Sequence, residues 1–360
     1  MAEKISERAD RLKKLAELKT IGINPFPAQA QKNNSVSAVM ADFEKLQKAE
    51  TKLVLAGRLR SLRAHGNLTF AHLQDEAGKI QLAFSKKEIG PDNYKNFSKY
   101  IDIGDFLQIT GTAFLTHNGE PSLMVKEWKL LAKAIRPLPE KWHGLTDDED
   151  RLRKRYLDIL FNDDVREMFI KRAKFWQSTR DFLIKKGFLE VETPVLENTT
   201  GGADAKPFIS HHNALAMDVY LRICAGELWQ KRLMIAGYEK TFEIGRVFRN
   251  EGMDAEHLQD YTHMEFYMAY ADYEDGMKLV EELFKYVAQE TFGTLKFKIK
   301  NFEVDLGKKW GRYDYRETVK RYTKIDILEA DLAAMEKKLK ELKVDYDKKD
   351  WQNRQDLEFL

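Results

Sequence analysis

Residues 240–270 constrain the fold of this chain more than any other segment, because two β-prone stretches flank a polar, charged loop. The stretches, at 240–248 and 263–270, have the length and the aromatic and branched residues that are typical of strands. We therefore predict an antiparallel strand pair that carries a long loop. The surrounding segments predict an α+β domain, with helices at 164–186, 227–236, 273–291 and 327–342 and a strand at 188–191.

Five further β-prone segments lie upstream, at 53–59, 68–73, 80–84, 106–112 and 121–125. Glu76-Ala77-Gly78 and Asn118-Gly119 supply turns between neighbouring segments. A helix predicted at 93–100 follows the third segment. Five strands with a helix after the third are the pattern of an oligonucleotide-binding (OB) fold, which presents one sheet face to single-stranded nucleic acid. A generic five-stranded barrel is the alternative interpretation.

Changes in composition along the chain indicate its domain boundaries. We expect an amphipathic, basic helix at 6–19 within an N-terminal helical arm of residues 1–50, followed by the barrel at 51–132. Residues 133–150 contain Pro137, Pro139 and an acidic run at 147–150, which is typical of a linker. The second domain then occupies residues 151–360.

Cysteine content and charge limit the class of protein. The single cysteine, Cys224, excludes an internal disulfide and a cysteine-rich zinc site. No apolar run approaches the roughly 18 residues of a membrane span, and the N-terminus has no signal-peptide core, so we expect a cytoplasmic protein. Residues 1–63 hold 13 Lys and Arg against 7 Asp and Glu. This excess favours either contact with a phosphate backbone or an ordinary solvated helix face.

The most specific motif is Thr-Phe-Glu-Ile-Gly-Arg-Val-Phe-Arg-Asn-Glu-Gly at 241–252. It resembles the second signature motif of class II aminoacyl-tRNA synthetases, in which an arginine begins the loop between two antiparallel strands. Residues 187–194, Gly-Phe-Leu-Glu-Val-Glu-Thr-Pro, resemble the first motif of that class. The resemblance implies a homodimer whose interface includes the stretch from Phe188 to Pro194.

Three further segments resemble the lysyl-tRNA synthetase family: Gly-Gly-Ala-Asp-Ala-Lys-Pro-Phe at 201–208, His-His-Asn-Ala-Leu at 211–215 and Met-Ala-Tyr-Ala-Asp-Tyr at 268–273. The resemblance covers essentially the whole chain. It implies an ATP-dependent ligase that activates L-lysine as lysyl-adenylate and transfers the lysyl group to the 3′ end of tRNA(Lys). The substrates and partners that it implies are L-lysine, ATP, Mg²⁺ and tRNA(Lys).

The implied chemistry needs positive charge beside ATP. Joining a carboxylate to ATP brings two anions together, so a permanently charged guanidinium is useful near the α-phosphate. By its position in the second motif, Arg249 is implied as that catalytic residue, together with Glu251. The resemblance also implies that Glu251 and His257 contact ATP and that adenine stacks on Tyr261. Without the motif, Arg249 would be interpreted as a surface salt-bridge residue and Tyr261 as a core tyrosine.

Recognition of lysine needs an anionic site. A lysine ammonium leaves water only where carboxylates and other oxygens replace its hydration. Glu265 and Tyr267 match the family's lysine-binding positions, and alternate residues of a strand point to the same face. Glu227 and Gly202 match the positions that hold the α-amino group. The segment Cys224-Ala225-Gly226-Glu227 is one residue longer than the family's usual Ala-Pro-Glu.

In the barrel, the resemblance implies that Phe70, Gln81 and Glu127 bind the anticodon. Phe70 and Gln81 lie on successive predicted strands, and Glu127 follows the last predicted strand. Stacking on an aromatic ring, combined with hydrogen bonds to base edges, is the usual way in which unpaired bases are recognised. The barrel is therefore the predicted anticodon-binding domain.

The third class II motif, a glycine-rich strand and helix with an arginine for the γ-phosphate, has no counterpart before Leu360. We therefore expect a truncated chain that is inactive alone and whose Mg²⁺ ligands lie beyond Leu360. A non-catalytic tRNA-binding protein is one alternative. A synthetase for aspartate or asparagine is another, although Glu265 would repel an aspartate side chain. An enzyme that lysylates a protein is a third, but such relatives lack the barrel.

Overall fold

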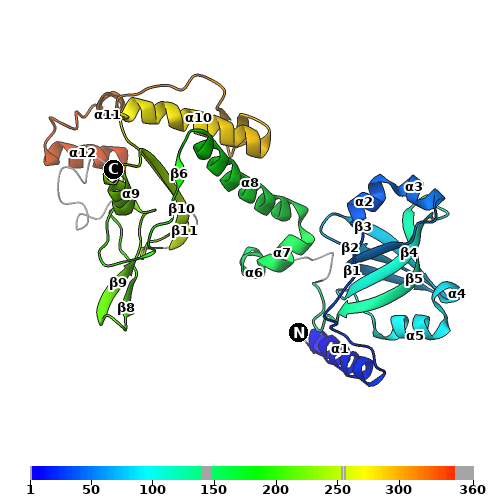
Figure 1. Cartoon of the computed structure of the whole chain (residues 1–360). Coiled ribbons are helices and arrows are strands. Elements are labelled where there is room, and N and C mark those ends of the chain that lie inside the picture. The colour runs from blue at the N-terminus through cyan, green and yellow to red at the C-terminus, as the bar shows by residue number, and fades with distance from the viewer. Residues whose placement is uncertain (1, 140–146, 253, 255–256, 345–360) are drawn as a thin grey trace. The chain divides into compact units, whose positions relative to one another are not determined.

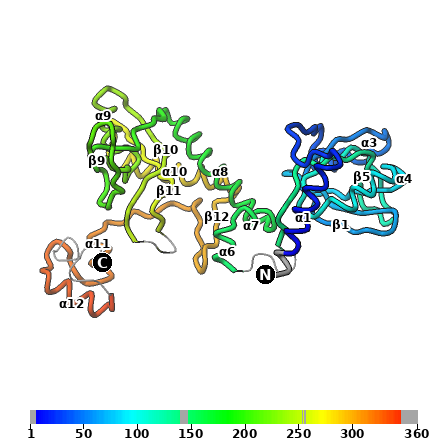
Figure 2. Tube along the Cα trace, turned by 90° about the horizontal axis from the view of Figure 1, so that it is seen from below, coloured from blue at the N-terminus to red at the C-terminus, as the bar shows by residue number. Residues whose placement is uncertain are grey.

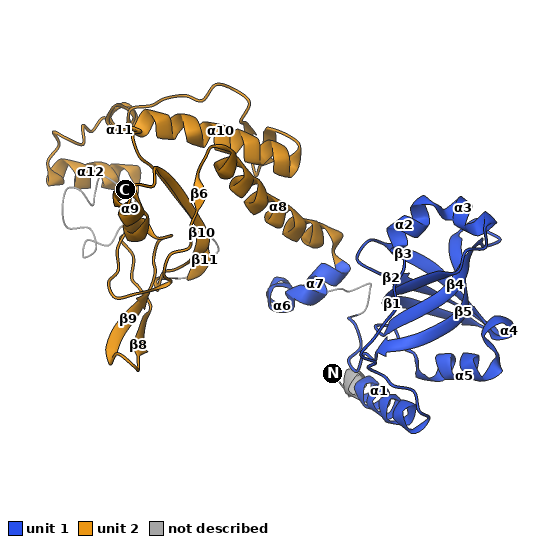
Figure 3. Ribbon diagram, viewed as in Figure 1, with its two compact units in different colours: residues 1–161 blue, residues 162–360 orange. Residues whose placement is uncertain are grey.

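The computed structural model describes residues 2–139, 147–252, 254 and 257–344. The chain divides into two compact units, residues 1–161 and residues 162–360 (Figure 3). Each unit encloses a hydrophobic core of its own. The α+β class predicted from the sequence is confirmed, with a barrel in the first unit and sheets flanked by helices in the second.

The first unit is built around a closed barrel with the strand order β1-β2-β3-β5-β4 (Figure 1). The pair β3 and β5 is parallel, and the other neighbours are antiparallel. Two helices, α4 (Lys86–Ile89) and α5 (Pro91–Tyr100), follow the third strand, so the predicted OB topology is confirmed. The strands are β1 (Leu53–His65), β2 (Leu68–Gln74), β3 (Lys79–Ser85), β4 (Phe106–Leu115) and β5 (Pro121–Ala132).

Alternating residues of each strand fill the barrel, because successive side chains of a strand point to opposite faces. The outer face is thereby left to polar and half-buried side chains. Phe97 of α5 closes one side of the core, and its ring stacks on that of Phe84 with the centroids 3.8 Å apart. Each strand contributes a fully enclosed aliphatic residue: Leu55, Leu73, Leu82, Ile109 and Leu123.

The last strand is longer than predicted. β5 continues to Ala132, whereas its alternation of apolar residues ends at Val125. Val125 lies opposite Gly111 and Glu127 lies opposite Thr110, so Lys126 is an extra residue at a bulge. The bulge places two exposed residues, Lys126 and Glu127, in succession. In the sequence, this break in the alternation looks like the end of the strand. The prediction that Glu127 follows the last strand is therefore wrong, because Glu127 lies inside β5.

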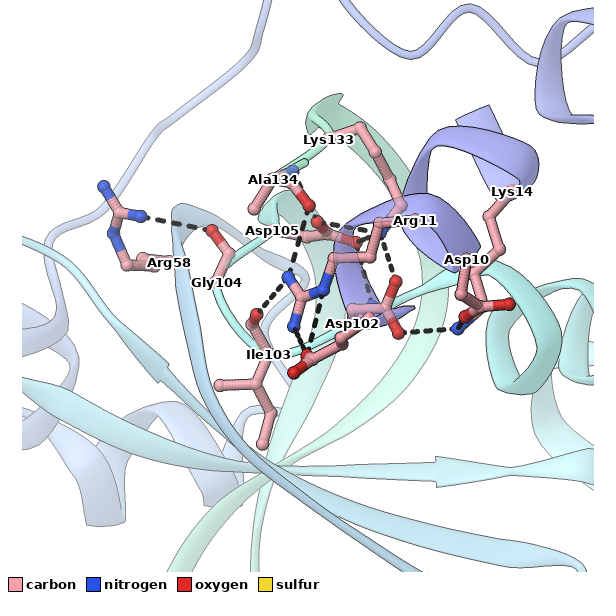
Figure 4. A network of polar contacts seen from close by, with 11 residues as sticks. Asp10, Arg11, Lys14, Arg58, Asp102, Ile103, Gly104, Asp105, Lys133 and Ala134 are labelled. Atoms are coloured by element: carbon pink, nitrogen blue, oxygen red, sulfur yellow. Dashed lines mark hydrogen bonds and ion pairs between the residues drawn. The ribbon is translucent and has the colours of Figure 1, made fainter. Parts of the chain in front are cut away.

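Helix α1 (Ala2–Thr20) is fixed to the barrel by charged groups, which Figure 4 shows. Arg11 donates to the backbone oxygens of Ile103 and Ala134, at 3.0 and 3.2 Å. Lys133 is bonded to Asp105 at 2.9 Å, and both side chains are completely buried. The remaining helices of the unit are α2 (Val36–Ala41), α3 (Phe43–Lys48), α6 (Asp148–Arg153) and α7 (Arg155–Phe161).

The second unit is organised around the sheet β11-β10-β6, made of β6 (Leu189–Glu190), β10 (Lys240–Phe248) and β11 (Asp260–Met268). Helices α8 (Asp163–Lys185) and α10 (Tyr273–Phe292) pack on one face of this sheet, where they enclose Phe242 (Figures 1 and 2). The predicted strand pair with its loop is confirmed, because β10 and β11 are antiparallel over their whole length.

The second unit also contains smaller elements. A second sheet has the order β7-β9-β8, and β12 pairs with β13. Helix α9 follows β9 and lies beside β10 and β11. These elements are β7 (Leu196–Glu197), β8 (Ile209–His212), β9 (Met217–Leu221), α9 (Glu227–Ile235), β12 (Lys296–Ile299), β13 (Phe302–Asp305), α11 (Tyr315–Thr323) and α12 (Leu332–Leu342).

Candidate functional site

The register of β10 and β11 separates a core face from a polar face. Residues directly opposite each other in an antiparallel pair share a face, and faces alternate along each strand. One face carries Phe242, Ile244, Met264 and Phe266 into the core beneath α8 and α10. The opposite face carries, in order along β11, Tyr261, His263, Glu265 and Tyr267, with Val247, Gly245, Glu243 and Thr241 across from them on β10.

Glu265 is the central carboxylate of the polar face. Its Oε1 accepts a hydrogen bond of 3.0 Å from the backbone N–H of Ala225, and Nδ1 of His263 lies 3.3 Å from the same oxygen. Burial acts to raise the pKa of Glu265, but the contacts with His263 and Ala225 and the charge of Arg222 outweigh it and lower the pKa. The side chain is therefore ionised at neutral pH.

Tyr267 lies two residues further along β11 on the same face. Burial raises the pKa of its phenol, and the carboxylates of Glu265 and Glu227 raise it further. The hydroxyl thus stays protonated and can donate or accept a hydrogen bond. Two carboxylates and a neutral phenol at one end of β11 are suitable groups for binding an ammonium ion.

Gly202 and Glu227 lie against each other, although 24 residues separate them in the sequence. Gly202 has a φ of +89°, and a Cβ at this position would overlap the Glu227 carboxylate and the Cys224 sulfur. A side chain at residue 202 is therefore excluded twice, by backbone strain and by space. Glu227 forms an ion pair with Lys231 one turn along α9.

Gly226 accommodates the extra residue of the segment before Glu227. It has a φ of +77°, which favours glycine, and its Cα lies close to Thr193 and Glu243. Helix α9 begins at the next residue and places Glu227 in its first turn. The four predicted lysine-binding residues, Gly202, Glu227, Glu265 and Tyr267, are thereby brought together at one end of the polar face.

A buried ion pair that we did not predict supports this end of the site. Arg222 and Glu243 are 2% and 4% exposed and form a salt bridge. Thr193 donates to the other Glu243 oxygen at 2.6 Å, and Nε of Arg222 donates to the Arg246 carbonyl at 2.8 Å. Glu243 is flanked by Phe242 and Ile244 in a predicted strand, and a buried charge is normally paired. That charge was the available sequence signal.

Arg249 and Tyr261 lie at the other end of the polar face. The backbone N–H of Arg249 donates to the Gln259 carbonyl at 2.8 Å, which continues the strand pairing by one residue. Its Nε donates to the Ile223 carbonyl at 3.4 Å, and its guanidinium carbon lies 5.7 Å from the centre of the Tyr261 ring. Both side chains are half-buried. A cation and an aromatic ring are thus adjacent on the face that carries Glu265.

The other two predicted ATP-binding residues lie on the loop. The carboxylate of Glu251 is exposed and accepts a 3.3 Å hydrogen bond from the backbone N–H of Lys206. His257 is 74% exposed, and its Nδ1 lies 2.8 Å from Asp254. The structure does not bring His257 to Arg249. Loop residues 253, 255 and 256 are not among the described residues.

In the barrel, Phe70 and Gln81 share the outer face of β2 and β3, because Gln81 lies opposite His72 and Phe70 lies opposite Ala83. The Gln81 amide is held at both atoms: Oε1 accepts from Ser122 at 2.9 Å, and Nε2 donates to Glu120 at 2.6 Å. Glu120 also lies 3.3 Å from Nε2 of His72. The sequence did not lead us to predict that Glu120 holds the Gln81 amide or that His72 lies beside Glu120. Glu127 lies further along β5, with no bond to Gln81 among the described residues.

The described part of the chain contains no helix that is long and apolar enough to cross a bilayer. Its His, Cys, Asp and Glu side chains form no group of three that could hold a metal ion, as far as the described ranges extend. The site carboxylates Glu227 and Glu243 are bonded to Lys231 and Arg222, respectively. These residues do not fit a Mg²⁺ ion, and we assign them no metal-dependent step.

Comparison with known proteins agrees with the two units. Residues 147–359 match the family of class II tRNA synthetases for D, K and N, and residues 53–131 match the OB-fold nucleic acid binding domain. The chain is 45% identical over 88% of its length to a lysine–tRNA ligase of Carboxydothermus hydrogenoformans and covers 64% of that protein. It is 42% identical over 95% of its length to the lysine–tRNA ligase of Thermosipho melanesiensis and covers 69% of it.

A third relative, the lysine–tRNA ligase of Moorella thermoacetica, is 46% identical over 89% of the chain, which spans 64% of that protein. The chain thus spans about two thirds of the length of the relatives it matches. The match extends through both the barrel and the β10–β11 site. On this evidence, the chain belongs to the lysine–tRNA ligase family of class II tRNA synthetases.

Proposed function

We propose that the protein activates L-lysine with ATP and transfers the lysyl group to the 3′ end of tRNA(Lys). The observation that carries the proposal is the order of groups along β11. Arg249 and Tyr261 lie at one end of the polar face, and Glu265 and Tyr267 lie at the other. A nucleotide and a diamino acid bound along this face would meet between the two ends.

In the first step, the lysine carboxylate attacks the α-phosphate of ATP, and pyrophosphate leaves. Arg249 stabilises the negative charge that develops on the α-phosphate, while Tyr261 stacks on adenine. In the second step, the terminal 3′-hydroxyl of the tRNA attacks the carbonyl carbon of lysyl-adenylate, and AMP leaves. The chain supplies no nucleophile in this scheme. Its contribution is to position the reactants and to stabilise charge.

Selection of lysine depends on the ionised Glu265. Its lowered pKa, together with the protonated phenol of Tyr267, provides an acceptor set for the side-chain ammonium. Glu227, packed on Gly202, is in place to accept from the α-amino group. The ionised Glu265 would repel the carboxylate of an aspartate side chain, so a synthetase for aspartate is disfavoured by like-charge repulsion.

The barrel supplies the proposed contact with tRNA(Lys). Phe70 is half-buried on the outer face and offers a ring for stacking, beside a Gln81 amide that Ser122 and Glu120 hold in one orientation. A fixed amide discriminates bases by their donor and acceptor pattern. Glu127 is included as a third contact on β5. We propose the cytoplasm as its location.

A homodimer is the proposed assembly. Helix α8 and the stretch from Phe188 to Pro194 expose apolar side chains that a partner could cover. A second copy would bury them in an isologous interface, as symmetric dimers do. The exposed side chains are Met168, Phe169, Ile170, Phe175, Ile184 and Leu189.

The proposed activity is tested by amino-acid-dependent exchange of pyrophosphate into ATP, measured on the complete protein that the reading frame encodes. We expect lysine to support exchange and aspartate and asparagine not to. Glu265→Gln should lower kcat/KM for lysine by about 30-fold or more, because it removes the charged partner of a half-buried ammonium. Glu239→Gln, an exposed carboxylate just before β10, is the matched control. Faster exchange with aspartate than with lysine would contradict the proposal.

A further inference from the structure

His263 has no role in the mechanism above, yet it lies at the centre of the polar face. On β11 it stands between Tyr261, whose ring centroid is 6.0 Å away, and Glu265. Its Nδ1 is buried, forms no hydrogen bond of good geometry, and lies 3.3 Å from Oε1 of Glu265. An imidazole in this position touches the proposed lysine-binding carboxylate directly.

The charged groups around His263 come from several elements. On its own strand it faces Glu265. Across the pair it faces Gly245, over which the Arg222 guanidinium lies. Arg222 is bonded to Glu243, so most of its charge is already balanced. The other ionisable groups of this face are Arg249 and Tyr261 at the nucleotide end, and Glu227, Cys224 and Tyr267 at the lysine end.

The two oxygens of Glu265 are used differently. Both the Ala225 N–H and His263 lie against Oε1. Oε2 receives no hydrogen bond from any residue that the structure describes. A ligand ammonium can therefore approach Oε2 while Oε1 stays engaged. The charge on His263 then decides how much of the negative charge of Glu265 remains for that ligand.

We infer that His263 is a positioning residue, and that the affinity for lysine depends on whether the His263 imidazole is protonated. This inference deepens the proposed function and rests on it. The neutral imidazole orients Glu265 and leaves the carboxylate charge to the lysine ammonium. The imidazolium neutralises that charge and repels the ammonium. The lysine ammonium and the His263 imidazolium thus compete for the negative charge of the same carboxylate, that of Glu265. By linkage, lysine that binds to the protonated site releases the proton.

The direction of the pH effect follows from this competition. Lysine affinity is high where His263 is neutral and falls as the pH decreases and the imidazole is charged. Burial acts to raise the pKa of Glu265, but its contacts keep the pKa below the ordinary value, so the carboxylate itself stays ionised near pH 5.5. The lysine side chain, with a pKa of about 10.4, does not titrate between about pH 5.5 and 7.5 either. Imidazole is the side chain whose ordinary pKa, about 6.5, lies within that range, and His263 is the imidazole of this face.

The test is calorimetric titration of L-lysine into the complete protein at pH 5.5, 6.5 and 7.5, in two buffers of different ionisation enthalpy. The buffer pair gives the number of protons released per lysine bound. For the wild type, we expect affinity at pH 5.5 to be at least about fivefold weaker than at pH 7.5, with protons released at pH 6.5. His263→Gln and His263→Asn should bind with nearly equal affinity at all three values and release none.

His211→Gln is the matched control, because His211 is an exposed histidine of the same unit that pairs with Asp218 on the β8–β9 hairpin. It should keep the wild-type pH dependence. Circular dichroism establishes that each variant is folded. Two neutral replacements of different length are used, so that an effect of side-chain length can be told from an effect of charge. The number of protons released by the wild type is measured without any variant.

The possible outcomes separate the two proposals. Lysine binding by the wild type without proton release at pH 6.5 would overturn the role of His263 and leave the proposed function standing. So would a pH dependence that survives in both His263 variants. A complete wild-type protein that binds no lysine at any pH, and behaves like Glu265→Gln, would overturn the proposed function and this inference together.

Discussion

Glu243 and Glu265 lie directly opposite each other on β10 and β11. Like charges in this position repel and would destabilise the strand pair. The chain gives each carboxylate a different partner: Arg222 forms a salt bridge with Glu243, whereas Glu265 receives the Ala225 N–H and the His263 ring. Glu243 is used in joining β10 to the segment that follows β9, through its salt bridge with Arg222. Glu265 keeps one oxygen that receives no hydrogen bond from the described residues and, by our proposal, recognises the substrate.

At the same scale, we predict that Arg249→Ala lowers kcat for lysine-dependent pyrophosphate exchange by about 10² to 10³, because it removes positive charge where the transition state gains negative charge. The matched control is Arg246→Ala. Arg246 lies three residues earlier, on the other face of β10, and its exposed guanidinium pairs with Asp260. Exchange rates are measured on the complete protein at saturating lysine. Equal losses in the two variants would contradict the assignment of Arg249.

At the scale of elements, strands with regular alternation were predicted well. The bounds 240–248 were predicted from the sequence and are those of β10, and the five barrel strands begin within one residue of their predicted starts. Local irregularities were not predicted. The bulge at Lys126 hid the second half of β5. Asp331 caps α12 through the Ala334 N–H, so this helix begins at Leu332 rather than at the predicted residue 327.

Contacts between distant segments explain the rest of what the sequence did not reveal. The pairing of Arg222 with Glu243 and the packing of Gly202 on Glu227 join segments that are not neighbours in the sequence. Spacing rules describe only residues within one element. The strands β7, β8 and β9 are short and mostly exposed, so they have no apolar alternation from which they could be predicted. His263 was not predicted either: its spacing from Glu265 indicates a shared face of β11, but only the structure shows that its Nδ1 is buried beside the Glu265 carboxylate.

The buried ion pair between Lys133 and Asp105 gives a stability prediction. Lys133→Ala should lower the free energy of unfolding of the first unit by about 3 kcal/mol or more, because it leaves the buried carboxylate of Asp105 without its cation. Urea unfolding followed by circular dichroism measures the loss. Lys126→Ala, which breaks only a surface pair with Glu88, is the control and should cost at most about 1 kcal/mol.

The pH dependence of that loss tests its cause. Burial raises the pKa of Asp105, against the opposing effect of Lys133 and two backbone N–H groups. Removing Lys133 raises it further, so the folded variant takes up a proton more readily than the unfolded chain. The difference between variant and wild type should therefore shrink as the pH falls from 7 towards 4. A difference that is constant with pH would show that lost packing, and not the uncompensated charge, is responsible.

At the scale of the whole molecule, the two units have separate cores and separate candidate sites. The aliphatic core of the barrel lies within residues 1–161, and the core beneath α8 and α10 lies within 162–360. The proposed anticodon contacts belong to the first unit, and the proposed lysine and ATP contacts belong to the second. Changes in one unit should therefore leave the chemistry of the other intact.

That separation predicts a split between two assays of the complete protein. Phe70→Ala should lower kcat/KM for aminoacylation of tRNA(Lys) by about tenfold or more, because stacking of one base on an aromatic ring contributes about 1–3 kcal/mol. Pyrophosphate exchange, which needs no tRNA, should keep its wild-type rate. Phe26→Ala removes a ring that is 52% exposed and lies outside the barrel strands, and it should change neither assay. Equal losses in exchange and aminoacylation for Phe70→Ala would mean that the barrel acts on the chemistry itself, because a defect confined to tRNA recognition cannot reach a reaction in which tRNA takes no part.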